Sequence, residues 1–187
     1  MTKTNLTEKT WIENGTFSHG SIDFDSLWSM KPENPDVIKM FGRDIPIPRL
    51  QKVFGIDYRF SGKTHRSILI PEEFHDMIEY FNNKYNRKYN MLLINWYHDG
   101  SKYISMHSDD ERQIVKQSEI ITLSLGDTRT FVLVNKKTKE KYKFSMSNND
   151  YITMGGYCQT EFKHGITKTK KAVGPRISIT LREFITA

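Results

Sequence analysis

The second half of the chain alternates apolar and polar residues with a period of two, and this pattern constrains the fold more than any other feature. Such alternation is typical of β-strands, because successive side chains point to opposite faces of a sheet. One amphipathic helix is predicted at residues 71–88. Eight short strands are predicted after it, at residues 91–97, 103–108, 118–125, 129–135, 141–146, 150–154, 161–167 and 176–183. This order of elements indicates an α+β, mainly β protein built as a sandwich or jelly roll.

The length of 187 residues is close to the roughly 150 expected of one domain. Residues 1–36 are polar and contain the turn signal Asn14-Gly15, so we expect an irregular N-terminal extension there. The domain itself is expected at residues 37–187. A hydrophobic content of 37% excludes a disordered chain. We expect a monomer.

The cellular setting is predicted from cysteine usage and from apolar runs. Cys158 is the one cysteine, and the first ten residues lack the apolar stretch of a signal peptide. We therefore expect an intracellular protein, nuclear if the source is eukaryotic and otherwise cytoplasmic. No stretch approaches the ~18 consecutive apolar residues of a membrane span, so no membrane partner is expected.

The net charge of +6 favours a polyanionic partner, although many proteins with this charge bind none. Residues 39–66 contain seven cations interleaved with aromatic residues, a mixture that can hold phosphates and stack bases. The lysine-rich residues 136–143 are interpreted as a solubilised hairpin turn. A third cluster contains Lys168, Lys170 and Lys171. The first stretch therefore favours a nucleic-acid partner.

Two predicted strands place polar side chains on one face. In residues 176–182 the polar face begins with Arg176 and ends with Arg182, and the other face is wholly apolar. In residues 91–97 an apolar face continues into Asn95 and Tyr97. A solvated surface strand would show the first pattern, whereas a strand entering a pocket would show the second. The two arginines could hold both ends of a small dicarboxylate, since guanidinium pairs with carboxylate in bidentate fashion.

A possible metal site combines His107, Asp109 and the later His164. His107 and Asp109 are two residues apart in an extended segment, so both side chains face the same way and can reach one ion. Two histidines and one carboxylate suit Fe(II) with open positions better than a structural zinc. Three protein ligands leave three coordination positions of the iron open. A 2-oxo acid could take two of them and dioxygen the third. The pair alone is weak evidence, and its weight comes from the order of these residues and the two arginines.

Several motifs together resemble those of the AlkB family of Fe(II)/2-oxoglutarate-dependent dioxygenases. They are N-W-Y-H-D-G at 95–100, H-S-D-D-E at 107–111, the histidine at 164 and P-R-I-S-I-T-L-R at 175–182. Upstream, F-G at 41–42, P-R-x-Q at 48–51 and Y-R-F-S-G at 58–62 resemble the animal branch that repairs alkylated double-stranded DNA. The resemblance covers roughly residues 37–184. It implies a double-stranded β-helix (jelly roll) with flanking helices.

The resemblance also implies roles for individual residues. His107, Asp109 and His164 would hold iron as the catalytic centre. The 2-oxoglutarate residues would be Asn95, Tyr97, Arg176, Ser178 and Arg182, although the family usually has Asn where Ser178 stands, which puts one cosubstrate contact in doubt. The substrate-binding residues would be Met40, Phe41, Gly42, Arg49, Tyr58, Phe60, Ser61, Asp110 and Glu111.

Within that set, Phe60 would stack on the substrate base opposite His107, and a carboxylate beside the pocket would favour a cationic methylated base. Met40 and Phe41 would form the apolar tip of a finger that fills the gap left by an extruded base. From the residues alone, Phe60 could equally be a core residue. Residues 40–41 could equally be one turn of a buried segment.

The implied activity is oxidative demethylation of 1-methyladenine and 3-methylcytosine in DNA, with duplex DNA as the expected substrate. It would use Fe(II), 2-oxoglutarate and O2 and release formaldehyde, succinate and CO2. Three alternatives stay open: the same chemistry on RNA or single strands, a non-catalytic nucleic-acid-binding jelly roll, and an oxygenase acting on proteins or small molecules. The last alternative leaves the aromatic and cationic residues 39–66 unexplained.

Overall fold

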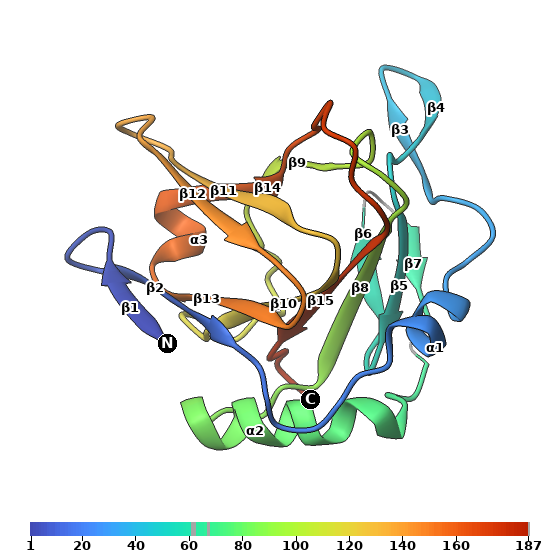
Figure 1. Cartoon of the computed structure of the whole chain (residues 1–187). Coiled ribbons are helices and arrows are strands. Elements are labelled where there is room, and N and C mark those ends of the chain that lie inside the picture. The colour runs from blue at the N-terminus through green and yellow to red at the C-terminus, as the bar shows by residue number, and fades with distance from the viewer. Residues whose placement is uncertain (61–62, 67, 187) are drawn as a thin grey trace.

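The computed structural model describes residues 1–60, 63–66 and 68–186, except the side chains of residues 58–60 and 63–65. Two β-sheets packed face to face form the body of the protein (Figure 1). Their strands are β1 (Thr2–Asn5), β2 (Thr10–Thr16), β5 (Leu50–Phe54), β8 (Met91–Tyr97), β9 (Ile104–His107), β10 (Ile120–Gly126), β11 (Arg129–Asn135), β12 (Lys141–Met146), β13 (Asp150–Gly156), β14 (Phe162–Ile166) and β15 (Arg176–Arg182).

The larger sheet has the strand order β1-β2-β13-β10-β15-β8-β5, and the smaller sheet has the order β12-β11-β14-β9. All the pairings are antiparallel, and the chain passes repeatedly from one sheet to the other between β8 and β15. This arrangement is the expected double-stranded β-helix. All eight predicted strands are present, with ends that agree to within two residues.

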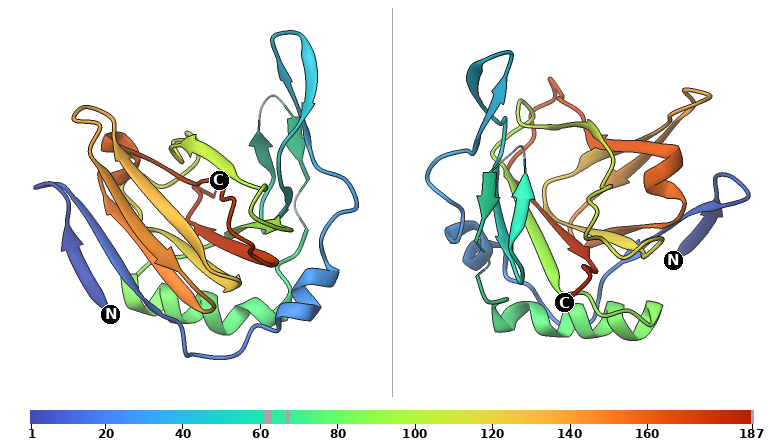
Figure 2. Two further views of the ribbon diagram at one scale, coloured as in Figure 1. Left: turned by 45° about the horizontal axis from the view of Figure 1, so that its top comes forward. Right: turned by 180° about the vertical axis from the view of Figure 1, so that it is seen from behind.

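The remaining elements lie around the two sheets. Two small hairpins, β3–β4 and β6–β7, precede the jelly roll, and the first of them projects from the body of the molecule (Figure 2). Their strands are β3 (Val37–Met40), β4 (Arg43–Pro46), β6 (Tyr58–Phe60) and β7 (Lys63–His65). The helices are α1 (Phe24–Ser29), a 3-10 turn (Glu72–Phe74), α2 (His75–Tyr85) and α3 (Cys158–Glu161).

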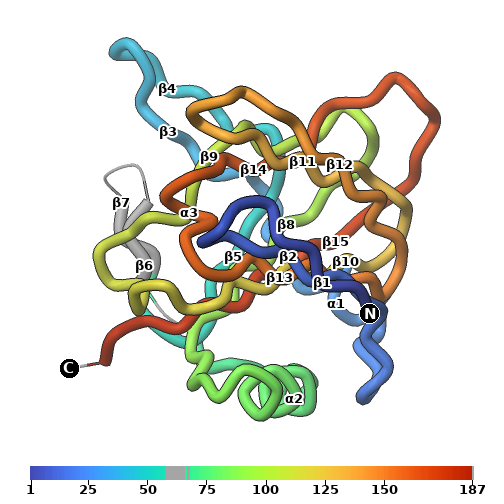
Figure 3. The backbone as a smooth tube through the Cα atoms, turned by 90° about the vertical axis from the view of Figure 1, so that its left-hand side faces the viewer, coloured from blue at the N-terminus to red at the C-terminus, as the bar shows by residue number. Residues whose placement is uncertain are grey.

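The predicted helix at residues 71–88 is shorter in the structure. It begins with the 3-10 turn and ends at Tyr85, because Asn86 adopts a left-handed conformation with φ of 51° that terminates helices. Its buried face includes Met77 and Phe81. This face packs on the side of the larger sheet that points away from the smaller sheet (Figure 3). Within the described residues, no helix has the length and apolar character that a bilayer crossing requires.

The two faces of β15 have different environments. Ile177, Ile179 and Leu181 pack in the apolar layer between the larger sheet and α2. The polar face is also buried, since Arg176 is 0% and Arg182 2% exposed. The interpretation of residues 176–182 as a surface strand is therefore excluded, and the polar side chains of this strand face the interior between the sheets.

The N-terminal segment is only partly irregular, because residues 1–36 contain β1, β2 and α1. β2 pairs with β13 over seven residues and extends the larger sheet, and Ile12 is completely buried. Trp11 lies opposite Gly155, where an added Cβ would be 2.1 Å from the indole ring. Only glycine allows this close approach.

The polar composition of β2 is tolerated because its charged residue has partners. Glu13 is 7% exposed and forms an ion pair with Lys84 of α2. The hydroxyl of Tyr85 also donates a hydrogen bond to the Glu13 carboxylate at 2.8 Å. These contacts compensate the burial of the charge, so a polar strand can join the core.

We predict that Ile12→Ala lowers the free energy of unfolding by about 2 to 4 kcal/mol, because it leaves a cavity between the sheets. Thr4→Ala is the matched control, since Thr4 lies opposite Ile12 on the exposed strand β1 and should change stability by less than about 0.5 kcal/mol. Urea unfolding followed by tryptophan fluorescence measures both. Equal, small effects would mean that β2 is not part of the core.

Candidate metal and cosubstrate site

The strand pairing of the smaller sheet brings together the three residues predicted to hold iron. His107 of β9 lies directly opposite His164 of β14, and the centroids of their rings are 4.3 Å apart. Asp109 follows β9 and is 3% exposed. One possible ligand atom from each residue lies within 4.8 Å of the other two. This is the only such group of His, Cys, Asp and Glu among the residues that the structure describes.

The two imidazoles present nitrogen atoms to the Asp109 carboxylate. Nδ1 of His107 lies 2.8 Å from the carbonyl oxygen of Ser105, so a proton on Nδ1 leaves the Nε2 lone pair facing Asp109 Oδ1 at 3.4 Å. Nε2 of His164 lies 3.7 Å from Asp109 Oδ2. Burial, together with the nearby His107, lowers the pKa of His164 to about 3. His164 is therefore neutral, as a metal ligand must be.

Asp109 is a buried anion with one unsatisfied oxygen. Arg182 donates a hydrogen bond to Oδ1 at 2.6 Å, whereas no hydrogen-bond donor reaches the buried Oδ2 from the described part of the chain. Burial acts to raise the pKa of this carboxyl, but Arg182 and the two imidazoles outweigh burial and hold the pKa below its usual range. An ionised carboxylate whose two oxygens face one imidazole each fits a divalent ion.

A narrow cavity lies between the two sheets beside this group. Its volume is about 30 Å3. The side chains predicted to bind 2-oxoglutarate or iron that line this cavity are Asn95, Tyr97, His107, Asp109, His164, Ser178 and Arg182.

Arg176 lies next to Tyr97 rather than on the cavity wall. Its Nε donates a hydrogen bond to the hydroxyl of Ser124 at 2.9 Å, and its Cζ lies 5.3 Å from the centre of the Tyr97 ring. Both terminal nitrogens are buried without a hydrogen-bond partner in the described part of the chain. Burial lowers the pKa of Arg176 to about 10, so the group remains charged near neutral pH. A buried guanidinium with two available nitrogens fits a carboxylate.

Arg49 was assigned to substrate binding, but in the structure it contacts a predicted cosubstrate residue. It is 8% exposed, and its Nε donates to the Oδ1 of Asn95 at 2.8 Å. The terminal Nη2 donates to Gln51 at 3.1 Å, and Gln51 donates to Asp36 at 2.8 Å. Because Oδ1 of Asn95 is occupied in this way, its NH2 group is the part that can face the cavity.

The predicted finger is a tight hairpin with an exposed tip. Met40 ends β3, Arg43 begins β4, and the two residues between them have positive φ angles of 51° for Phe41 and 76° for Gly42. This is the turn that joins twisted strands most directly. Phe41 is 97% and Met40 44% exposed, so the interpretation of residues 40–41 as a buried segment is excluded.

The structure describes only some of the other predicted substrate residues. Asp110 and Glu111 line a second cavity of about 570 Å3 that extends to Asp109. Glu111 also accepts a hydrogen bond from Arg182 at 3.4 Å. Ser61 and the side chains of Tyr58 and Phe60 lie outside the described residues, so their roles stay predictions.

Two residues of the site were not found from the sequence. Ser124 of β10 accepts the hydrogen bond from Arg176, and a serine within the apolar run at residues 120–125 could have signalled it. The side chain of Gln159 accepts a hydrogen bond from the backbone N–H of Asp109 at 2.8 Å. Gln159 lies in α3, whose four residues are too few to show a periodic pattern, so nothing in the sequence indicates this contact.

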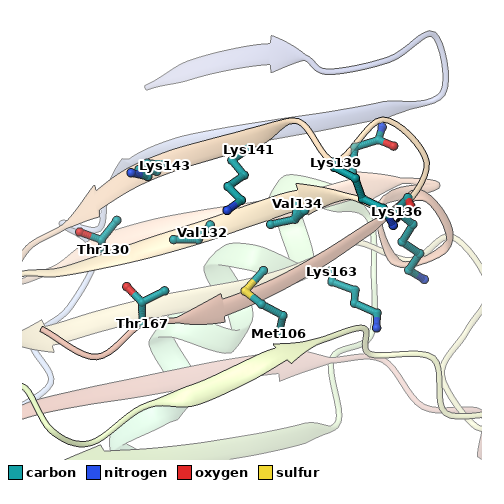
Figure 4. A pocket seen from close by; sticks show the side chains of 11 residues that line it. Met106, Thr130, Val132, Val134, Lys136, Lys139, Lys141, Lys143, Lys163 and Thr167 are labelled. Carbon is teal, nitrogen blue, oxygen red and sulfur yellow. Dashed lines mark hydrogen bonds between the residues drawn. The ribbon is translucent and has the colours of Figure 1, made fainter.

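A lysine-rich groove of about 810 Å3 lies on the outer face of the smaller sheet. Val132, Val134 and Met106 line its floor (Figure 4). Among the described residues that line the groove none is acidic, and five are lysines: Lys136, Lys139, Lys141, Lys143 and Lys163. The lysines at residues 136–143 are thus part of a larger basic surface, which residue order alone does not reveal.

Comparison with known protein families agrees with this geometry. Residues 42–182 match the model described as the 2OG-Fe(II) oxygenase superfamily. The chain belongs to this superfamily. An oxygenase that uses Fe(II), 2-oxoglutarate and O2 is therefore confirmed as its class, and the His-Asp-His group fits the metal. The similarities to individual proteins also confirm the expected AlkB family.

Three relatives define this similarity within the superfamily. The chain is 28% identical to DNA oxidative demethylase ALKBH2 of Bos taurus and of Homo sapiens over 163 residues, which is 79% of this chain. It spans 57% and 61% of the lengths of those two proteins. It is also 30% identical over 103 residues to alpha-ketoglutarate-dependent dioxygenase alkB homolog 3 of Mus musculus, covering 50% of this chain and 36% of that protein.

A solved structure supports the fold. The structure of OsALKBH1 superposes with a TM-score of 0.66 and covers 97% of this chain and 100% of that chain at 16% sequence identity. At this identity the likeness concerns the fold alone. It agrees with the jelly roll built by strands β8 to β15.

We predict that Asp109→Asn weakens Mn(II) binding by more than the roughly 10- to 100-fold that loss of an outer partner costs, because it removes the anionic ligand. Asp110→Asn is the matched control, since Asp110 is the exposed neighbour of Asp109 and should leave the affinity unchanged. Isothermal titration of the metal-free protein with Mn(II) measures both. Retained affinity in Asp109→Asn would remove this residue from the metal site.

Proposed function

We propose that this chain is an oxidative demethylase that repairs 1-methyladenine and 3-methylcytosine in duplex DNA. The observation that carries the proposal is the convergence of His107, Asp109 and His164 in a chain similar to DNA oxidative demethylases over most of its length. Fe(II), when bound with 2-oxoglutarate and O2, would supply oxidation of the N-methyl group, and the reaction would yield formaldehyde, succinate and CO2. The residues of the chain hold, orient and shield the reacting groups.

The residues around the site support a cationic substrate base. Asp110 and Glu111 line the larger cavity that extends to Asp109. Carboxylates at this position attract a methylated adenine or cytosine, which carries a positive charge that the undamaged base lacks. Arg182 donates hydrogen bonds to both Asp109 and Glu111, so Asp110 is the exposed carboxylate of this stretch that can contribute to selection.

Three features on one side of the molecule support a nucleic-acid substrate. The β3–β4 hairpin, the loop between β14 and β15 and the turn between β11 and β12 project from the same side (Figures 1 and 3). The loop carries Lys168, Lys170 and Lys171, and the turn leads into the lysine-rich groove. A backbone of phosphates can contact several of these cations at once, and release of counterions favours that binding.

The exposed tip of the β3–β4 hairpin supports duplex DNA over single strands. Phe41 is a bulky residue held in the left-handed conformation and is almost fully exposed to solvent. Both properties are unfavourable unless the residue has a use. An apolar wedge between base pairs offsets part of the cost of unstacking a base, which is a few kcal/mol.

The main test measures succinate and formaldehyde release with Fe(II), 2-oxoglutarate and O2. We expect one formaldehyde per repaired base from duplex DNA that contains 1-methyladenine, and none from the unmethylated duplex. Asp109→Asn should give none from either. Methylated single strands and methylated RNA run in parallel, and faster turnover of either would replace duplex DNA as the substrate. No product from any methylated nucleic acid would contradict the proposal.

We predict that Phe41→Asn slows repair of methylated duplex about tenfold while repair of a methylated single strand stays within about twofold. Asparagine tolerates the left-handed conformation, so the hairpin keeps its shape while the wedge is lost. Val37→Ala, at the base of the same hairpin, is the matched control and should slow neither reaction. Equal losses on both substrates would favour the single-strand alternative.

A further inference from the structure

Arg129 is a buried arginine that the sequence patterns do not reveal. It begins β11 and is 3% exposed. Its guanidinium donates three hydrogen bonds to backbone carbonyl oxygens, at 3.0 Å to Asp99, 2.8 Å to Lys102 and 2.8 Å to Thr167. None of the ion pairs among the described residues involves Arg129. The carboxylates of Asp99 and Asp127 act on the charge of Arg129 only at longer range, without forming an ion pair.

These hydrogen bonds hold two loops at one end of the jelly roll. Asp99 and Lys102 belong to the connection between β8 and β9, and Thr167 follows β14. The N–H of Thr169 also donates to the carbonyl oxygen of Gly100 at 2.9 Å, so the two loops contact each other directly. Arg129 thus fixes the loops that follow Tyr97 and precede Arg176.

Arg129 also lies beside the aromatic ring of the predicted cosubstrate site. The centre of the Tyr97 ring is 5.8 Å from Cζ of Arg129 and 5.3 Å from Cζ of Arg176. Tyr97 lies opposite Arg176 in the pairing of β8 with β15. Two guanidinium groups therefore flank one tyrosine ring, which favours its present orientation through cation–π attraction.

We propose that Arg129 is a positioning residue that sets the affinity and the selectivity of the cosubstrate site for a dicarboxylate keto acid. It orients Tyr97 and the two loops, and it adds a second positive charge beside the Tyr97 ring that Arg176 also contacts. The terminal nitrogens of Arg176 fit the distal carboxylate. A keto acid with only one carboxylate gains little from this charge. The inference rests on the family's use of 2-oxoglutarate and not on the identity of the nucleic acid.

The test measures binding without turnover. Protein loaded with Mn(II) is titrated in a calorimeter with 2-oxoglutarate, and with the monocarboxylate 2-oxopentanoate, in the absence of nucleic acid and with O2 excluded. Arg129→Gln should weaken 2-oxoglutarate binding about tenfold or more and should weaken 2-oxopentanoate binding much less, so the ratio of the two affinities falls about tenfold. In turnover assays the KM for 2-oxoglutarate should rise while kcat stays within about twofold.

Arg129→Lys separates the charge from the geometry. Lysine keeps the positive charge but lacks the planar fork that reaches three carbonyl oxygens, so 2-oxoglutarate should bind more weakly while the ratio of affinities stays near that of the wild type. The control is Arg87→Gln, because Arg87 pairs with Glu119 away from the site, and it should change neither affinity. Melting temperatures without keto acid identify any variant that is unfolded under the assay conditions.

Two outcomes would overturn the inference. The first is an unchanged affinity ratio in Arg129→Gln, and the second is wild-type affinity for 2-oxoglutarate in Arg129→Lys. If Arg129→Gln does not fold, the second outcome alone still decides. Because the titration contains no nucleic acid, its result does not depend on whether the chain repairs DNA.

Discussion

The site depends on the way Asp109 is held as a buried charge. Burying an ion pair is costly, and the short hydrogen bond from Arg182 compensates only one oxygen of the Asp109 carboxylate. The other oxygen faces His164, which burial keeps neutral. A divalent ion would complete the compensation, since it would accept the free oxygen and both imidazoles as ligands. Metal binding and the packing of the two sheets are therefore linked, because Arg182 comes from the larger sheet and the histidines from the smaller one.

Most of the jelly roll could be predicted from the sequence because its strands bury different chemistry on their two faces. In β15 the apolar face packs under α2 and the polar face lines the interior, so the alternation reports the fold directly. β2 was missed for the opposite reason. Its buried positions include Glu13, whose partners Lys84 and Tyr85 lie on a helix about 70 residues away. No pattern within β2 itself shows that these partners exist.

The candidate site was predictable where spacing within one strand or motif carries the chemistry. His107 and Asp109 could be paired in this way, and so could the two arginines of β15. Arg129 could not, since its partners are backbone carbonyl oxygens, which every residue type provides. Arg49 is a second residue whose observed contact could not be predicted from spacing within one strand. Its motif indicated a substrate contact, whereas its hydrogen bond to Asn95 depends on the pairing of β5 with β8.

The smaller sheet contributes to both the metal group and the lysine-rich groove, because neighbouring residues of a strand point to opposite faces of the sheet. On β14, His164 faces the metal group while Lys163 lines the lysine-rich groove. On β9, His107 faces the metal group while Met106 lines the lysine-rich groove. A shift of either strand by one residue would exchange the two sets, so a single register determines both the metal group and the basic surface. The pairing of β14 with β9 becomes irregular just after His164, where a bulge can re-aim a side chain. Since the ligand pair is one of the two registered positions of that pairing, an ion bound by both histidines would hold the register that also orders the lysines on the outer face.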